Sequence, residues 1–163
     1  MPTLRCTARL LKRLNQKPDL NPLVPSNRLG DWYANLLNVG PHRLVLVTSE
    51  RSLLSLVVPI KEPAHLRERI REHAHALLYN LGVPPGLAAA EVRGMQHMPF
   101  AKTADRSVLG SMNDFAFHAE VYLHSVGNDV DLARLEALLA SIPCAPLKYL
   151  YPLDVTRHLF EMT

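Results

Sequence analysis

Three apolar segments follow one another between residues 32 and 60, and they constrain the fold more than any other feature of the chain. They cover Trp32 to Val39, Arg43 to Thr48 and Leu53 to Ile60, and short polar turns separate them. Their Leu and Val content and short connections predict a three-stranded antiparallel meander. Both alternating faces of the strands are mostly apolar, so the predicted sheet needs cover on two sides.

Helical patterns lie on either side of this meander in the sequence. Apolar residues at helical spacing predict a short basic helix between Thr7 and Asn15 and a longer one from Pro63 to Leu81. A short Ala-rich helix is predicted from Gly86 to Arg93. Two more are predicted to begin at a capping residue, one at Asp105 or Thr103 and ending near Ser125, the other from Asp131 to Ser141.

Three short segments favour extended structure instead. They are Thr3 to Cys6, Met95 to Thr103 and a C-terminal segment in which Leu147, Tyr149 and Tyr151 alternate before a frayed helical turn. Pro99 restricts the second of these to a sheet edge. We therefore expect a single α+β domain over residues 1–163, with an antiparallel sheet, formed by the meander plus one or two further strands, flanked by helices.

Composition excludes several classes of protein. With 48% hydrophobic and 20% charged residues, the chain is neither disordered nor fibrous. No apolar run approaches the ~20 residues that span a bilayer, and the N-terminus lacks a secretory signal, so we expect a cytoplasmic protein without membrane contact. Cys6 and Cys144 share no metal or redox spacing, which predicts reduced core thiols and neither a metal nor a cofactor.

The N-terminal segment is strongly basic. Residues 1–28 hold six Arg or Lys side chains against Asp19 alone, whereas the whole chain has a net charge of +3. Such a surface attracts phosphate groups or acidic proteins. The candidate nucleic-acid contacts are Arg5, Arg9, Lys12 and Arg13. The alternative is that these side chains form an ordinary solvated helix face.

A polar row runs along the helix predicted to begin near residue 105. On a helical wheel the apolar residues occupy one arc, and the opposite arc carries Ser107, Ser111, Asp114, His118 and Ser125, with Asn113 on its flank. Lys102, Thr103, Arg106 and Ser107 crowd the helix start, where free N–H groups and the helix dipole favour an anion. Ser111, Asn113 and Asp114 are predicted to line the same binding site.

Asp114 and His118 allow a second interpretation. Because they are four residues apart on one helix face, both can ligate one metal ion, or the carboxylate can orient the imidazole as a general base. A metal normally needs a third ligand, which the sequence does not identify. An ordinary surface pair is the simpler alternative.

The segment Asp31 to Asn35 is the second candidate wall of this site. It contains the only Trp of the chain at the start of a predicted strand, with polar side chains beside it. Trp32 or Tyr33 would offer a stacking face for a ring, and Asp31 and Asn35 would supply polar contacts. The alternative is that Trp32 belongs to the core.

Three stretches resemble a prokaryotic family, domain of unknown function 6933. They are LRCTARLLKRL at 4–14, RLGDWYANLL at 28–37 and, most specifically, KTADRSVLGSMNDF at 102–115. The family pattern has Asn before Arg106, where this chain has Asp105. The resemblance brings no established activity. It implies that the Trp32 segment and the Arg106 to Asp114 segment belong to one shared feature, structural or functional.

These observations lead to three hypotheses for the function. The first is a binding or regulatory module that recognises an anionic ligand, either a phosphate-containing molecule or nucleic acid. The second is an enzyme, a metal-assisted phosphodiesterase or other hydrolase using Asp114 and His118. The third is a protein-interaction module that binds an operon-encoded partner or forms a homodimer through Phe117 and Val121.

Overall fold

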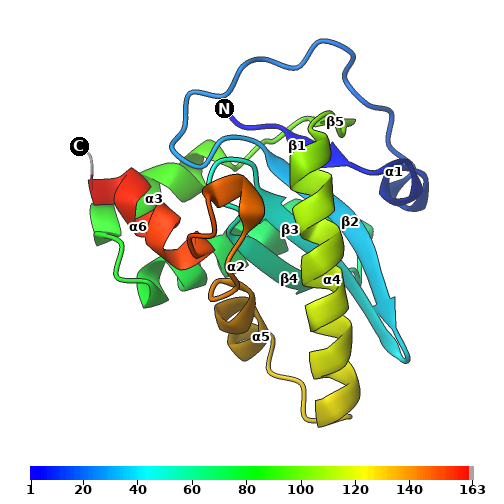
Figure 1. Cartoon of the computed structure of the whole chain (residues 1–163). Coiled ribbons are helices and arrows are strands. Elements are labelled where there is room, and N and C mark those ends of the chain that lie inside the picture. The colour runs from blue at the N-terminus through cyan, green and yellow to red at the C-terminus, as the bar shows by residue number, and fades with distance from the viewer. Residues whose placement is uncertain (162–163) are drawn as a thin grey trace.

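The computed structural model describes residues 1–161 and contains one five-stranded sheet with helices on both sides (Figure 1). The strands lie in the order β4-β3-β2-β1-β5, with bounds β1 Leu4–Cys6, β2 Trp32–Val39, β3 His42–Ser49, β4 Ser55–Pro59 and β5 Phe100–Lys102. The helices are α1 Ala8–Leu14, α2 Leu66–Asn80, α3 Pro85–Gly94, α4 Arg106–Val126, α5 Leu132–Leu139 and α6 Pro152–Glu161, together with the short 3-10 helices η1 Pro63–His65 and η2 Ala145–Leu147.

The meander is confirmed, and the two further strands join it in parallel. β2, β3 and β4 pair antiparallel, whereas β1 pairs in parallel with both β2 and β5. The α+β class with flanking helices is therefore confirmed, but the sheet is mixed and not wholly antiparallel. The long connections between β1 and its two neighbours permit parallel pairing, which a tight hairpin does not. β5 lies at the sheet edge, as Pro99 predicts.

Both faces of the sheet are covered, as the apolar strands require. Trp32 and Ala34 of β2 point into a core closed by α1, α2, α3 and α6. Tyr33 and Leu37 of the same strand point into a second core closed by α4 and α5. The side chains of a strand alternate between faces, so these neighbouring residues belong to different cores.

The free edge of β4 is protected by a buried carboxylate. Glu136 of α5 is 3% exposed. Its Oε2 atom accepts a hydrogen bond from the backbone N–H of Val57 at 2.9 Å and lies 2.8 Å from Nδ1 of His73 in α2. One side chain therefore joins the edge strand to a helix from each face of the sheet. This contact satisfies an edge N–H that would otherwise be free to pair with another chain.

The C-terminal segment differs from its prediction. Its alternating pattern predicts a last strand over residues 147–151, but the chain forms η2 there and α6 after it, with only an isolated bridge between Cys144 and Leu150. Lys148 and Tyr149 have φ angles of 55° and 65°, which are incompatible with an extended strand. Pro152 then opens α6, a position that suits proline.

Candidate functional site

The chain has a topological switch point where β1 and β5 end. These two strands are parallel neighbours, and Cys6 lies opposite Lys102 at their carboxyl ends. α1 follows β1 and packs on the Trp32 side of the sheet, whereas α4 follows β5 and packs on the Tyr33 side. In sheets with parallel strands, ligands bind outside the carboxyl ends where successive helices leave to opposite faces. This end of the sheet is therefore a candidate site.

The first turn of α4 is already capped by the protein. The Asp105 carboxylate accepts hydrogen bonds from the backbone N–H of Ser107 at 2.8 Å and of Val108 at 3.4 Å, and from the Ser107 hydroxyl at 2.8 Å. The hydroxyl bond is the main reason that the pKa of Asp105 lies below its usual value. These three donors already have a partner in Asp105, and the role of Ser107 in anion binding stays a prediction.

Two cations near this cap remain available to a ligand. Lys102, at the end of β5, and Arg106, in the first turn of α4, are exposed. Among the described residues neither has a carboxylate oxygen within 4.0 Å. Thr103 lies between them and is half-buried. An anion at this end of the sheet would meet the Lys102 and Arg106 side chains, whereas the N–H groups of Ser107 and Val108 already bond Asp105.

The segment Asp31 to Asn35 does meet the start of α4. The Tyr33 hydroxyl accepts a hydrogen bond from the backbone N–H of Asp105 at 3.0 Å. Arg5 of β1 donates through Nε to Oδ2 of Asp31 at 2.8 Å and through Nη1 to the carbonyl of Lys102 at 3.0 Å. Arg5 of β1 therefore links β5 to Asp31, the residue that precedes β2. Asp31 balances the charge of Arg5, and the role of Arg5 as a nucleic-acid contact stays a prediction.

Two other predicted site residues serve the fold. Trp32 is 0% exposed and lies in the core on the far side from α4, so it offers no stacking face to a ligand. The prediction for Trp32 is wrong because side chains alternate along β2. Asn35 accepts hydrogen bonds from the Thr7 hydroxyl at 2.7 Å and from the backbone N–H of Leu36 at 2.8 Å. These bonds tie β2 to the beginning of α1.

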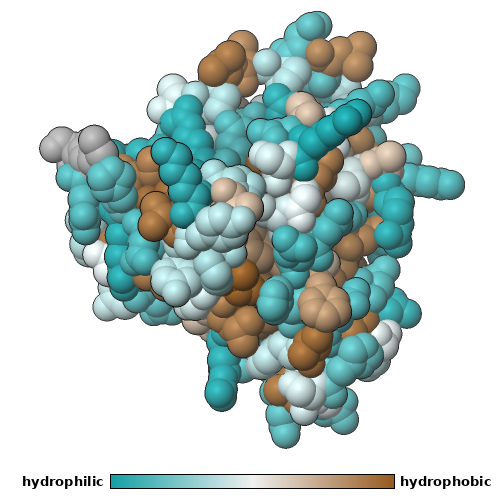
Figure 2. All heavy atoms as spheres, viewed as in Figure 1, coloured by the Kyte–Doolittle hydropathy of each residue, from teal (hydrophilic) through white to brown (hydrophobic). Residues whose placement is uncertain are grey.

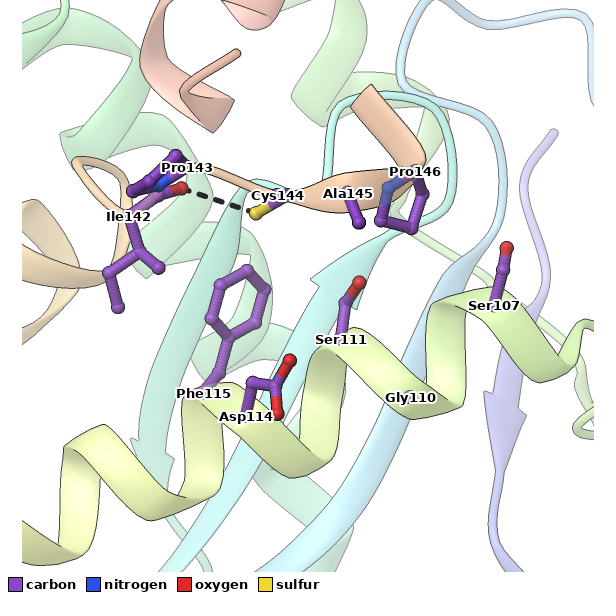
Figure 3. A pocket seen from close by; sticks show the side chains of 10 residues that line it. All are labelled: Ser107, Gly110, Ser111, Asp114, Phe115, Ile142, Pro143, Cys144, Ala145 and Pro146. Atoms are coloured by element: carbon purple, nitrogen blue, oxygen red, sulfur yellow. Dashed lines mark hydrogen bonds between the residues drawn. The ribbon is translucent and has the colours of Figure 1, made fainter. Parts of the chain in front are cut away.

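A pocket of about 270 Å³ lies between α4 and residues 142–146 (Figure 3). The α4 side contributes Ser107, Ser111 and Asp114 from the predicted polar row, together with Gly110 and Phe115. The opposite side consists of Ile142, Pro143, Cys144, Ala145 and Pro146. The polar row thus faces a hollow over its first two turns. Asn113 is exposed and does not belong to the lining.

Cys144 brings a neutral thiol to this pocket. Burial, with a smaller contribution from the nearby Asp114 carboxylate, raises the pKa of Cys144 to about 11. The thiol donates a hydrogen bond to the carbonyl of Ile142 at 3.2 Å. A raised pKa keeps the thiol protonated at neutral pH, and the protonated form is a weaker nucleophile than the thiolate. Burial likewise raises the pKa of Cys6 to about 12.

A comparison with known families identifies the family of this chain. A family model described as Domain of unknown function (DUF6933) matches residues 3–155. The chain belongs to this family. No curated protein and no solved structure matches it. The part of this DUF6933 chain that matches contains both the switch point and the pocket along α4.

Among the described residues, this DUF6933 chain supplies no third ligand for a metal ion at Asp114 and His118. Asp114 lines the pocket, but His118 does not, and the His118 ring packs edge-on against Phe117 with ring centroids 5.9 Å apart. Over residues 1–161 no group of three or more His, Cys, Asp or Glu residues is close enough to hold a metal ion. Asp114 and His118 are both exposed, and among the described residues their side chains form no ion pair within 4.0 Å.

Exposed apolar side chains accompany the pocket. Phe117 and Val121 on α4 are 64% and 54% exposed, and Leu138 on α5 is 41% exposed. Figure 2 shows apolar atoms at the surface over these two helices. That Phe117 and Val121 form a homodimer contact stays a prediction. Within residues 1–161 no helix has the length and apolar character needed to span a membrane.

Sequence reasoning on this DUF6933 chain missed the second wall of the pocket. Residues 142–146 are distant in sequence from α4 and carry no recognisable motif; Pro143 indicates only where α5 must end. It also missed Glu50, which follows β3 and lies beside Asp31. Burial, followed by the Asp31 charge, raises the pKa of Glu50. The apolar pattern of β3 does not indicate that Glu50, the residue after this strand, lies beside Asp31.

Proposed function

We propose that the protein is a binding module for phosphate-bearing ligands, with its contact surface where β1 and β5 end. One observation carries the proposal: Lys102 and Arg106 stand exposed, without carboxylate partners among the described residues, at the switch point of the sheet. Phosphate oxygens form strong charge-assisted hydrogen bonds with such side chains. Parallel strand ends of this kind are common sites for phosphate-bearing ligands.

The basic face of α1 supports an extended ligand. Arg9, Lys12 and Arg13 are exposed on the helix that begins directly after β1, next to Lys102 of the neighbouring strand. None of them has a carboxylate oxygen within 4.0 Å in the described part of the chain. A single phosphate group would contact only Lys102 and Arg106. A nucleic acid would engage α1 as well, because its phosphates repeat along the backbone.

Pyrophosphate and a short DNA duplex separate these two versions. We expect pyrophosphate to shift the backbone NMR signals of residues 102–107, and Lys102→Ala/Arg106→Ala to abolish the shifts. Lys61→Ala/Arg134→Ala is the matched control, because it removes the same charge from exposed positions elsewhere. Unchanged signals in the wild-type protein with both pyrophosphate and duplex would overturn the proposal.

Salt dependence then decides whether nucleic acid is a ligand. If the duplex binds across α1, its affinity falls steeply with added salt, and Arg9→Ala/Lys12→Ala/Arg13→Ala reduces the slope by about three, one for each lost phosphate contact. The same triple variant leaves pyrophosphate binding unchanged. Duplex affinity that does not respond to salt rejects the nucleic-acid version and leaves the smaller phosphate ligand as the proposed partner.

A further inference from the structure

We propose that the pocket between α4 and residues 142–146 binds a small organic ammonium ion. This ligand is opposite in charge to the phosphate-bearing ligand proposed for the switch point. The pocket residues that would hold its N–H groups are Ser111 and Asp114, and the apolar wall around them would hold a compact ring or short hydrocarbon.

Ser111 is the first observation that points to a ligand. Its side chain points into the pocket, and the residue is only 7% exposed (Figure 3). Two other serines of α4 form local hydrogen bonds: the Ser107 hydroxyl donates to the Asp105 carboxylate, and the Ser125 hydroxyl donates to the carbonyl of Tyr122. In the described structure the Ser111 hydroxyl has no such partner. The buried orphaned side-chain atoms of the described residues are Asn27 Oδ1 and Trp32 Nε1, so the Ser111 hydroxyl is open to the pocket and a group bound there would meet a free donor and acceptor.

Asp114 determines the sign of the ligand's charge. Its carboxylate points into the same hollow, one helical turn beyond Ser111 (Figure 3). No Lys, Arg or His nitrogen of residues 1–161 lies within 4.0 Å of it. An ionised carboxylate only accepts hydrogen bonds, so the ligand must donate them, and a positive charge strengthens the contact. Residues three apart on a helix are neighbours, so one ammonium group can reach both side chains.

The other residues that line the pocket determine which apolar group the ligand carries. Phe115, Ile142, Pro143 and Pro146 present carbon atoms, and the Cys144 thiol is protonated. A volume of about 270 Å³ lies just below the usual range for drug-sized ligands, which indicates a small molecule. Apolar surface of this kind binds a hydrocarbon ring, whereas Asp114 at the side disfavours an organic anion.

Benzylammonium is a suitable probe because it combines a ring with one ammonium group. We expect it to shift the NMR signals of residues 107–115 and 142–146 in the full chain. Asp114→Asn should weaken its binding about tenfold, and Ser111→Ala should weaken it less, since one charge-assisted and one neutral hydrogen bond are lost, respectively. Asp129→Asn is the matched control, because Asp129 is an exposed carboxylate outside the pocket.

Several results would overturn the inference. One is that Asp114→Asn and Asp129→Asn bind benzylammonium with equal affinity, while the NMR spectra without ligand show that both variants are folded. Another is that benzyl alcohol or benzoate binds as tightly as benzylammonium, or that adenine, a neutral amine donor, binds more tightly. Lys102→Ala/Arg106→Ala should retain benzylammonium binding while losing that of pyrophosphate. Joint loss of both ligands in that folded variant would mean a single site and would also overturn the inference.

Discussion

The Tyr33 hydroxyl accepts a hydrogen bond from the backbone N–H of Asp105 at 3.0 Å, joining the first residues of β2 to the cap of α4. These residues are 72 positions apart in the chain. Asp105 in turn holds the first turn of α4 through its carboxylate. This hydrogen bond therefore links the two segments that the family motifs mark, at the end of α4 where the polar row begins.

Removing this hydroxyl should destabilise the protein. We expect Tyr33→Phe to lower the free energy of unfolding by about 1 kcal/mol, because the Asp105 N–H loses its partner while the ring stays buried. Urea unfolding measures the change. Tyr79→Phe removes a hydroxyl from a side chain that is 69% exposed and should have no measurable effect. Equal stability of both variants would contradict a structural role for the Tyr33 hydroxyl.

The variant Asp105→Asn separates the helix-capping role of this side chain from the effect of its negative charge. Asp105→Asn should change stability by less than about 0.5 kcal/mol, because Asn caps helices as well as Asp does. The same change should raise pyrophosphate affinity about fivefold, since it removes one negative charge, worth roughly 1 kcal/mol, beside Lys102 and Arg106. Isothermal titration measures the affinity. An equal gain in Asp129→Asn would show that only the net charge of the protein matters.

The buried carboxylate at the edge of β4 should contribute strongly to stability. Glu136→Ala leaves the Val57 N–H and the His73 ring without their acceptor, and we expect a loss of about 2 kcal/mol. Amide hydrogen exchange at Val57 should accelerate in this variant. Glu120→Ala, at an exposed position on α4, serves as control and should cost less than about 0.5 kcal/mol. Similar losses in the two variants would contradict this role of Glu136.

Glu50 should make the fold less stable as the pH rises. Because burial raises its pKa in the folded state, folding takes up a proton in the window between the ordinary and the raised pKa, and stability falls across that window with increasing pH. Glu50→Gln should therefore raise Tm at pH 7. The side chain is half-exposed, which limits the gain to about 3 °C. Below the ordinary pKa of Glu the difference should vanish, and a gain that persists there would contradict the explanation.

Much of the fold could be predicted because local patterns agree with it. Apolar residues on both faces of β3 and β4 predict cover on two sides, and cores on both sides are present. Asp105 and Asp131 predict helix starts, and each side chain accepts a hydrogen bond from the first turn that follows. These signals are local, because capping and side-chain alternation depend on residues a few positions apart.

The candidate site was harder to predict, because it depends on contacts between distant segments. Trp32 and Tyr33 are adjacent in sequence, yet only Tyr33 reaches α4, and the register of β2 decides which of them does. Arg5 looks like a free cation in the sequence until Asp31 is placed beside it. The polar row of α4 was visible from its periodicity, but the wall opposite Ser111 and Asp114 was not.

The sequence by itself determined the elements: a basic first helix, an apolar meander, an edge strand after Pro99 and a long helix with one polar face. Only the tertiary structure decided that β1 and β5 lie in parallel and that residues 142–146 close over the polar face. The physical reason is the range of the interactions involved. Turns, caps and periodic faces are set by neighbours along the chain, whereas strand order and pockets come from packing surfaces that lie far apart in sequence.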